Sequence, residues 1–236
     1  MAIGTLFLIP TTISEGTITQ VLPSQLFEII NTIDEYIVEN ERNARRFLKE
    51  AGLKIPQDKL ILHVLDKHAK NLPYATFLKN CMVGKKIGLL SDAGCPAIAD
   101  PGAEVVLAAH KLKIKVLPLV GPSSILLALM SSGFNGQSFT FNGYLPIDKP
   151  ARIKKIKELE KQSKLENQTQ LFIETPFRNK QLFEELVKTC SLGTFMSICC
   201  DATGVEEYIF TATITDWKKI EPPIQKKPAI FSIYCK

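Results

Sequence analysis

Short apolar runs alternate with longer amphipathic stretches over the first half of the chain. Runs of this length are typical of buried strands, and apolar positions at helical spacing are typical of helices that cover a sheet. The predicted strands are residues 5–9, 33–38, 60–65, 87–90 and 116–120, and the predicted helices are residues 22–30, 42–50, 74–81 and 103–111. Regular alternation of the two favours a mostly parallel sheet with helices on both faces.

The pattern changes after a turn-rich segment, residues 117–124, which contains two prolines and a glycine. Beyond it we expect helices at 125–130, after Pro150 and at 181–188, and strands at 139–145 and 170–174. Three further strand-like runs, 195–200, 208–214 and 229–234, follow without a helical pattern between them, which indicates antiparallel pairing. The sequence therefore predicts an α/β fold of two α/β domains, residues 1–118 with a mostly parallel sheet and residues 119–236 with a mixed sheet.

Composition describes an ordinary globular chain. Of the 236 residues, 45% are hydrophobic and 22% are charged, which excludes disordered and fibrous classes. The 29 basic and 24 acidic residues leave a net charge of +5. This excess permits contact with nucleic acid but is too small to indicate a dedicated binding tail.

Cysteine and histidine usage gives expectations about compartment and metals. The six cysteines form no Cys-x-x-Cys pair, and residues 1–10 look like a buried strand and not a leader, so we expect reduced thiols in the cytoplasm. No run approaches the roughly 20 apolar residues that span a bilayer, and we expect no membrane association. His63, His68 and His110 are scattered without ligand spacing, so no metal site is expected.

The segment at residues 88–102 combines an apolar strand with small residues, two aspartates and two prolines. Ligands of open α/β sheets bind at the carboxyl ends of strands, which is where Asp92 falls. Small residues there let the backbone approach a ligand closely. Asp100 and Pro101 have the character of a helix N-cap followed by proline at the first helical position.

Two further loops have a similar character. Ser123 and Ser124 follow a strand and precede a helix, where they either cap the helix or contact a ligand. In the second loop a strand ends at Glu174 and Pro176 forces a turn before Arg178. An ion pair between Glu174 and Arg178 is the alternative to a ligand contact.

Four motifs occur in a fixed order: SDAGCPAIADPG at 91–102, PLVGPSS at 118–124, FNGYLP at 141–146 and ETPFR at 174–178. Together they resemble the tetrapyrrole methylase superfamily. The most similar branch is the bacterial small-subunit ribosomal RNA ribose-2′-O-methyltransferases, whose members also open with a string similar to GTLFLIPT at 4–11. The resemblance covers nearly the whole chain.

The resemblance implies S-adenosyl-L-methionine as methyl donor, bound in a cleft between the two domains of a homodimer subunit. Carried over by position, it assigns cofactor contacts to residues on both sides of that cleft. These are Pro10, Asp92, Ala93, Gly94, Ala97, Ile98, Ser123, Ser124, Glu174, Ala202, Pro228 and Ala229.

A ribose hydroxyl is a poor nucleophile at neutral pH, so an RNA substrate would benefit from a general base. The candidates are Glu39, Glu174 and Asp201, with Asp92 more plausible as a cofactor contact. The helix at 149–164 carries many lysines, which either contact phosphates or form the solvated face of an amphipathic helix. The expected contacts to an RNA or ribosomal-subunit partner are Arg42, Arg152, Lys154, Lys155 and Arg178.

Departures from the family pattern leave three functional hypotheses. Residues 200–204 read CDATG where the ribosomal enzymes carry a charged run. After the second predicted strand, residues 39–42 match the family's charged motif only at Glu39 and Arg42. The first hypothesis is a methyltransferase acting on ribosomal RNA. The second is a methyltransferase of a small corrinoid or tetrapyrrole precursor, and the third is a catalytically silent RNA- or ribosome-binding homologue.

Overall fold

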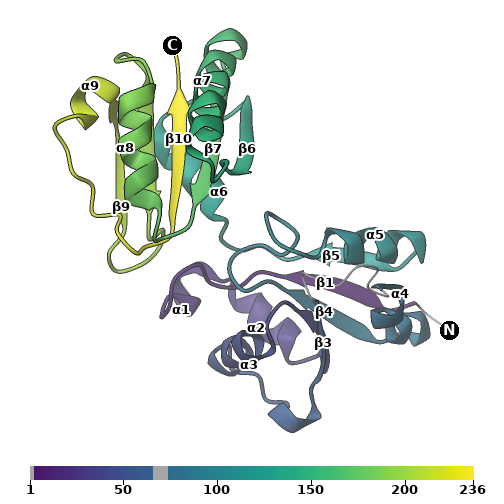
Figure 1. Cartoon of the computed structure of the whole chain (residues 1–236). Coiled ribbons are helices and arrows are strands. Elements are labelled where there is room, and N and C mark those ends of the chain that lie inside the picture. Colours follow the sequence, from purple (N-terminus) through teal and green to yellow (C-terminus); the bar gives the residue numbers. More distant parts are fainter. Residues whose placement is uncertain (1–2, 66–73) are drawn as a thin grey trace. The chain divides into compact units, whose positions relative to one another are not determined.

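A computed structural model describes residues 3–65 and 74–236. The chain divides into two compact units, residues 1–123 (unit 1) and residues 124–236 (unit 2), each built around a five-stranded sheet (Figure 1). His68 lies outside the described residues. Across the described part of the chain, no helix combines the length and apolar character needed to cross a membrane.

The sheet of unit 1 is entirely parallel, with strand order β3-β2-β4-β1-β5. This confirms the parallel sheet predicted from the alternating pattern. Because the strands run in one direction, their carboxyl ends lie together at one side of the sheet, called here the unit-1 edge. The strands are β1 (Thr5–Ile9), β2 (Glu35–Val38), β3 (Ile61–Val64), β4 (Lys86–Leu90) and β5 (Lys115–Pro118).

Helices cover both faces of this sheet because successive strand residues point to opposite sides. Phe7 and Ile9 pack with α2 and α3, whereas Leu6 packs with α5 on the other face. Burial on both faces explains the near-continuous apolar character of the strands. The helical segments are α1 (Ile18–Val21), α2 (Ser24–Ile30), α3 (Glu41–Glu50), the 3₁₀ turn Gln57–Lys59, α4 (Tyr74–Phe77), the 3₁₀ segment Lys79–Val83 and α5 (Ala103–Lys111).

The predicted helix at 103–111 is α5 (Ala103–Lys111), but its cap differs from the one expected. Helix α5 begins at Ala103, and Gly102 precedes it with a φ of +130°, a conformation that favours glycine. The predicted Asp100 cap with Pro101 at the first helical position is therefore wrong. Residues 91–102 form an irregular loop instead.

The sheet of unit 2 is mixed, with strand order β6-β7-β10-β8-β9. Strands β6 and β7 are parallel, whereas β10 lies antiparallel between β7 and β8, and β9 is antiparallel to β8. This confirms the predicted mixed sheet with antiparallel C-terminal strands. The strands are β6 (Phe139–Tyr144), β7 (Thr169–Glu174), β8 (Phe195–Cys200), β9 (Tyr208–Thr213) and β10 (Ala229–Tyr234).

Helices also cover both faces of the second sheet (Figure 1). Helices α7 (Lys149–Glu166) and α8 (Asn179–Thr189) pack on one face, and α6 (Ser124–Ser132) packs on the other. Asp148 caps α7 by accepting a hydrogen bond from the Ala151 N–H at 3.0 Å, and proline occupies the first turn. The basic helix expected after Pro150 is therefore α7.

Unit 2 contains one short helix that was not expected. The last three strands were predicted without helices between them, but α9 (Ile214–Trp217) follows β9. The Thr213 side chain caps this helix, accepting from the Asp216 N–H. Trp217 is buried and donates its indole N–H to the Met196 carbonyl at 2.8 Å. A polar side chain at the cap and one buried aromatic thus suffice for a single turn that periodicity does not reveal.

All six cysteines lie within residues 3–65 and 74–236, and all are free thiols. Five are buried, and Cys95 is only partly buried. Burial raises the pKa of Cys81 and of Cys200 to about 11, so these thiols stay protonated at neutral pH. Thiolate is the reactive form of cysteine, so burial and protonation together protect them.

We expect an alkylating reagent to modify Cys95 before the five buried cysteines in the native protein. Peptide mass spectrometry after timed exposure to iodoacetamide measures this order, and labelling in urea supplies the reference in which all six thiols react. Labelling of Cys199 as fast as Cys95 in the native protein would contradict the burial described above.

Candidate functional site

Residues that follow four strands of unit 1 come together at the unit-1 edge. The Thr11 N–H, just after β1, donates to the Gly94 carbonyl at 2.9 Å in the loop after β4. The Ser91 hydroxyl donates to the same carbonyl at 3.2 Å. These bonds bring Pro10 and Ala93 into neighbouring loops, as expected from the parallel strand order.

The loop after β5 joins this group through a glycine. A Cβ atom at Gly121 would lie only 2.3 Å from Pro10 Cβ, so no larger residue fits without displacing one of the two loops. The Cys95 thiol donates to the Pro122 carbonyl at 3.3 Å, which connects the loops after β4 and β5. Ser123 follows directly, whereas Ser124 is the first residue of α6 in unit 2.

Two acidic residues stand at the unit-1 edge. Glu39 follows β2, is only 9% exposed, and accepts a hydrogen bond from the Asp92 N–H at 3.2 Å through Oε1. The side chain of Asp92 is itself exposed. Arg42 is exposed in the first turn of α3, which Asn40 caps. The buried carboxylate of Glu39 thus holds the loop after β4, which carries the exposed carboxylate of Asp92.

The loop at residues 91–102 contains backbone conformations that side chains rarely adopt. Ala97 has a φ of 67° and Ala99 a φ of 62°, and the Ile98 side chain between them is 53% exposed. Left-handed non-glycine residues carry a free-energy cost and cluster at functional sites. The conformation supports a binding role for this loop.

The candidate residues of unit 2 also lie side by side, at the edge where β6, β7 and β8 end, called here the unit-2 edge. Glu174 pairs with Ala229 in the antiparallel register of β7 and β10. The Asp201 N–H donates to the Pro228 carbonyl at 2.9 Å, and the buried Ala202 follows. Residues separated by about fifty positions along the chain are therefore neighbours.

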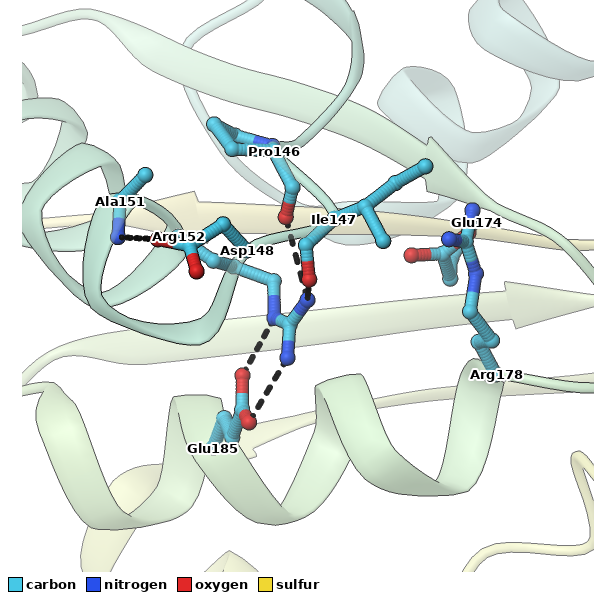
Figure 2. Close-up of polar contacts among 8 residues, drawn as sticks. All are labelled: Pro146, Ile147, Asp148, Ala151, Arg152, Glu174, Arg178 and Glu185. Atoms are coloured by element: carbon cyan, nitrogen blue, oxygen red, sulfur yellow. Dashed lines mark hydrogen bonds and ion pairs between the residues drawn. The ribbon is translucent and has the colours of Figure 1, made fainter.

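Glu174 and Arg178 form the ion pair that was the alternative to a ligand contact (Figure 2). Arg178 Nη2 lies 2.6 Å from Glu174 Oε1, and the Thr175 N–H donates to the same oxygen at 2.6 Å. The Glu174 side chain is 1% exposed and that of Arg178 is 28% exposed. The pair neutralises a buried carboxylate and fixes the turn that follows β7.

Residues 200–204, which depart from the charged run of the family, continue from the end of β8 into a tight turn. Asp201 and Thr203 have φ values of 51° and 66°. Asp201 Oδ2 accepts from the Glu206 N–H at 3.1 Å, and a Cβ at Gly204 would lie 2.3 Å from the same oxygen. The Asp201 carboxylate therefore organises the turn, and a side chain at Gly204 would displace it.

Arg152 has a structural role that sequence did not reveal. Its side chain is 3% exposed and forms a bidentate pair with Glu185 of α8, with Nη2 at 2.9 Å from Oε1 (Figure 2). Its Nη1 donates to the carbonyls of Pro146 and Ile147 at 3.1 and 2.6 Å. The expectation that Arg152 contacts RNA is therefore corrected, because the guanidinium is buried and its Nε, Nη1 and Nη2 all donate to groups inside unit 2.

The other cations expected to contact RNA remain at the surface. The Lys154 side chain is 80% exposed, within 4.0 Å of Glu158 one turn further along α7. Lys155 is partly buried on the same helix. Surface pairs of this kind contribute little to stability, so these side chains remain available to a partner.

Sequence reasoning missed three residues that build these edges: Thr11, Gly121 and Asn179. Asn179 is fully buried, and its side-chain amide donates to the Lys227 carbonyl at 2.6 Å. Gly121 lies between two apolar residues and a proline, a local pattern that can be recognised in the sequence. No local pattern marks Thr11 or Asn179. Among the described residues, no group of three or more His, Cys, Asp or Glu side chains is arranged to hold a metal ion.

The fold and the loops that end its strands define the class of protein. A crystal structure of the methyltransferase CobJ superposes with a TM-score of 0.59 over 100% of both chains, at 14% sequence identity. The chain therefore has the two-sheet α/β fold of a methyltransferase. A search of protein-family models found no match.

Sequence relatives narrow this class to a family. Three proteins named ribosomal RNA small subunit methyltransferase I are similar to the chain. The one from Buchnera aphidicola subsp. Schizaphis graminum is 30% identical over 98% of this chain and 78% of its own length. The protein from Halalkalibacterium halodurans is 30% identical over 90% of this chain and 69% of its own length. The protein from Vibrio cholerae is 32% identical over 77% of this chain and 59% of its own length. The chain belongs to the ribosomal RNA small subunit methyltransferase I family.

The buried pair between Arg152 and Glu185 gives a prediction about unit 2. Replacing Arg152 by alanine leaves a buried carboxylate without its partner, which costs about 3–5 kcal/mol. Trp217 is the single tryptophan and is buried in unit 2, so its fluorescence during urea unfolding reports this loss. The combined change Arg152→Met and Glu185→Leu should be more stable than either single variant, and Lys154→Ala should change stability by less than about 0.5 kcal/mol.

The same pair predicts a dependence on pH. The hydrogen bond from Arg152 lowers the pKa of Glu185 below its ordinary value of 4.5. The folded state therefore binds a proton on Glu185 less tightly than the unfolded state does. The contribution of the ionised pair to the free energy of unfolding is thus present above pH 4.5 and is lost as the pH falls below it. Wild type should lose more stability on acidification than the double variant. Equal losses would contradict the role given to the pair.

Proposed function

We propose that the chain is an S-adenosylmethionine-dependent methyltransferase that modifies the ribosomal RNA of the small subunit at a ribose 2′-hydroxyl. The observation that carries the proposal is the similarity to proteins named ribosomal RNA small subunit methyltransferase I, which extends over 98% of the chain and so includes both units. The protein is further proposed to work as a homodimer in the cytoplasm, where its substrate is assembled.

The residues of unit 1 fit a cofactor that approaches the backbone closely. Gly121 has no room for a side chain, and the loop at 91–102 exposes backbone in left-handed conformations beside the carboxylate of Asp92. Carboxylate oxygens accept hydrogen bonds from ribose hydroxyls and from an ammonium group. Residues proposed to hold the methionine and ribose are Pro10, Asp92, Ala93, Gly94, Ala97, Ile98, Ser123 and Ser124.

The residues of unit 2 fit the adenosine portion. Ala229 begins β10 beside Glu174 at the end of β7, Pro228 directly precedes it, and Ala202 follows β8. Ala202 and Ala229 are buried and small, and the neighbouring carbonyls are fixed by the strand register. Small apolar residues beside fixed backbone groups are typical of pockets for a flat heterocycle.

Bound S-adenosylmethionine supplies a methyl group already activated on a sulfonium sulfur. The chain therefore acts mainly by holding the acceptor hydroxyl in line with that group and by excluding water. Glu39 and Asp201 remain the proposed candidates to accept the hydroxyl proton. Glu174 is given a positioning role, because its carboxylate is already paired with Arg178 at 2.6 Å. Arg42, Lys154 and Lys155 are proposed to contact phosphates, whereas Arg178 shares the positioning role of Glu174 through their ion pair.

Replacing Gly121 by alanine tests the cofactor site. The new methyl group would displace the loop after β5 from Pro10, so we expect at least a tenfold weaker binding of S-adenosylhomocysteine in isothermal calorimetry. Gly136→Ala is the matched control, because nothing lies within 4 Å of an added Cβ there. Equal affinities in the two variants would show that the Gly121 contact does not shape the site.

Methyl transfer tests the substrate. Purified protein is incubated with labelled S-adenosylmethionine and small ribosomal subunits, isolated ribosomal RNA or a tetrapyrrole precursor, and the product is mapped. We expect label in a ribose of the small-subunit RNA. Label only in the tetrapyrrole would replace the proposed substrate by a small molecule. Cofactor binding without transfer to any acceptor would favour the silent homologue.

A further inference from the structure

An exposed aromatic residue stands at the unit-2 edge, in a loop whose backbone is hydrogen-bonded to that of an exposed lysine from another loop. Phe177, in the turn after β7, is 83% exposed, so packing within unit 2 does not bury its ring. Lys226 is exposed in the loop before β10 and has a φ of 60°. Neither residue takes part in the cofactor contacts proposed above.

The two loops are fixed against each other by buried polar contacts. The Lys226 N–H donates to the Pro176 carbonyl at 3.1 Å, which places Lys226 next to the residue before Phe177. The buried side-chain amide of Asn179, at the start of α8, donates to the carbonyls of Ile224 and Lys227 at 3.3 and 2.6 Å. The Glu174–Arg178 pair holds the other end of the turn. The aromatic ring and the cation are therefore presented on a rigid support.

The surroundings of this pair are apolar and carry compensated charge. Tyr144 ends the neighbouring strand β6 and is 59% exposed, and Ile147, three residues further on, is 74% exposed. Lys227 is paired with Glu206 at 3.0 Å, and Arg178 with Glu174. A flat exposed ring with an exposed cation alongside matches the chemistry of an unpaired base and its phosphate.

We propose that Phe177 stacks on an unpaired base of the RNA substrate while Lys226 contacts the adjacent phosphate. The inference rests on the proposed function and deepens it, because it assigns recognition of single-stranded RNA to the unit-2 edge. An enzyme that modifies one ribose must hold that nucleotide away from regular helix stacking. A rigid ring beside a cation does this without reading the sequence.

Fluorescence anisotropy with a short, labelled, unstructured RNA measures the contact directly. Phe177→Ala should weaken binding about tenfold or more, Phe177→Leu should weaken it similarly, and Phe177→Trp should retain it, because stacking needs a flat ring. Lys226→Ala should reduce the slope of log affinity against log salt by about 0.7, the value for one phosphate contact to a single strand. A duplex of the same sequence should respond less to the Phe177 variants.

The matched control is Leu165→Ala, because Leu165 is 73% exposed beside Lys164 near the C-terminal end of α7, close to where β7 begins and therefore away from the unit-2 edge. Calorimetry with S-adenosylhomocysteine should give wild-type affinity for all these variants. RNA affinity of Phe177→Ala equal to that of Leu165→Ala would overturn the proposal. So would a change from dimer to monomer in sedimentation for Phe177→Ala, which would identify the ring as a contact with a second copy.

These outcomes separate the inference from the proposed function. Wild type that binds the cofactor and RNA but transfers no methyl group would contradict the proposed activity while leaving the stacking contact supported by the Phe177 series. Wild type that methylates ribosomal RNA with rates unchanged by Phe177→Ala and Lys226→Ala would support the activity and overturn the contact.

Discussion

The common direction of the five strands in unit 1 is the constraint on which the candidate site of that unit depends. Parallel strands end at one edge, so the residues after β1, β2, β4 and β5 meet although they are distant in sequence. The Thr11–Gly94 bond and the approach of Gly121 to Pro10 complete this arrangement. Reversal of any one strand would take its loop to the opposite end of the sheet.

Unit 2 reaches a comparable arrangement through charge compensation. The carboxylates of Glu174 and Glu185 form ion pairs with arginines of unit 2, and that of Asp201 accepts a hydrogen bond from a backbone N–H of the same unit. Arg152 and Arg178 are used for this and not as open cations, which leaves lysines as the exposed positive groups on α7 and before β10. Unit 2 thus separates its two arginines, which hold the scaffold, from lysines that face solvent, a division that suits the planar, bidentate geometry of the guanidinium.

Sequence periodicity was sufficient for the fold class because both sheets are buried on both faces and their strands are correspondingly apolar. Strand β8 and strand β10 begin and end where the pattern predicts, at Phe195–Cys200 and Ala229–Tyr234. Helix α9 and the cap of α5 were missed, since a single turn and a glycine with positive φ have little periodic signal. The burial of Arg152 was also unpredictable, because its partner Glu185 is 33 residues away.

The central position of β10 has a consequence for how the protein is made. Strands β6 and β7 pair with each other, and so do β8 and β9, but the two pairs are joined only through β10. During synthesis, the edges of β7 and β8 therefore stay open until residues 229–234 have left the ribosome. Open strand edges invite pairing with other chains. Unit 1 contains all its own strands by residue 118, so its sheet can close while unit 2 is still being translated.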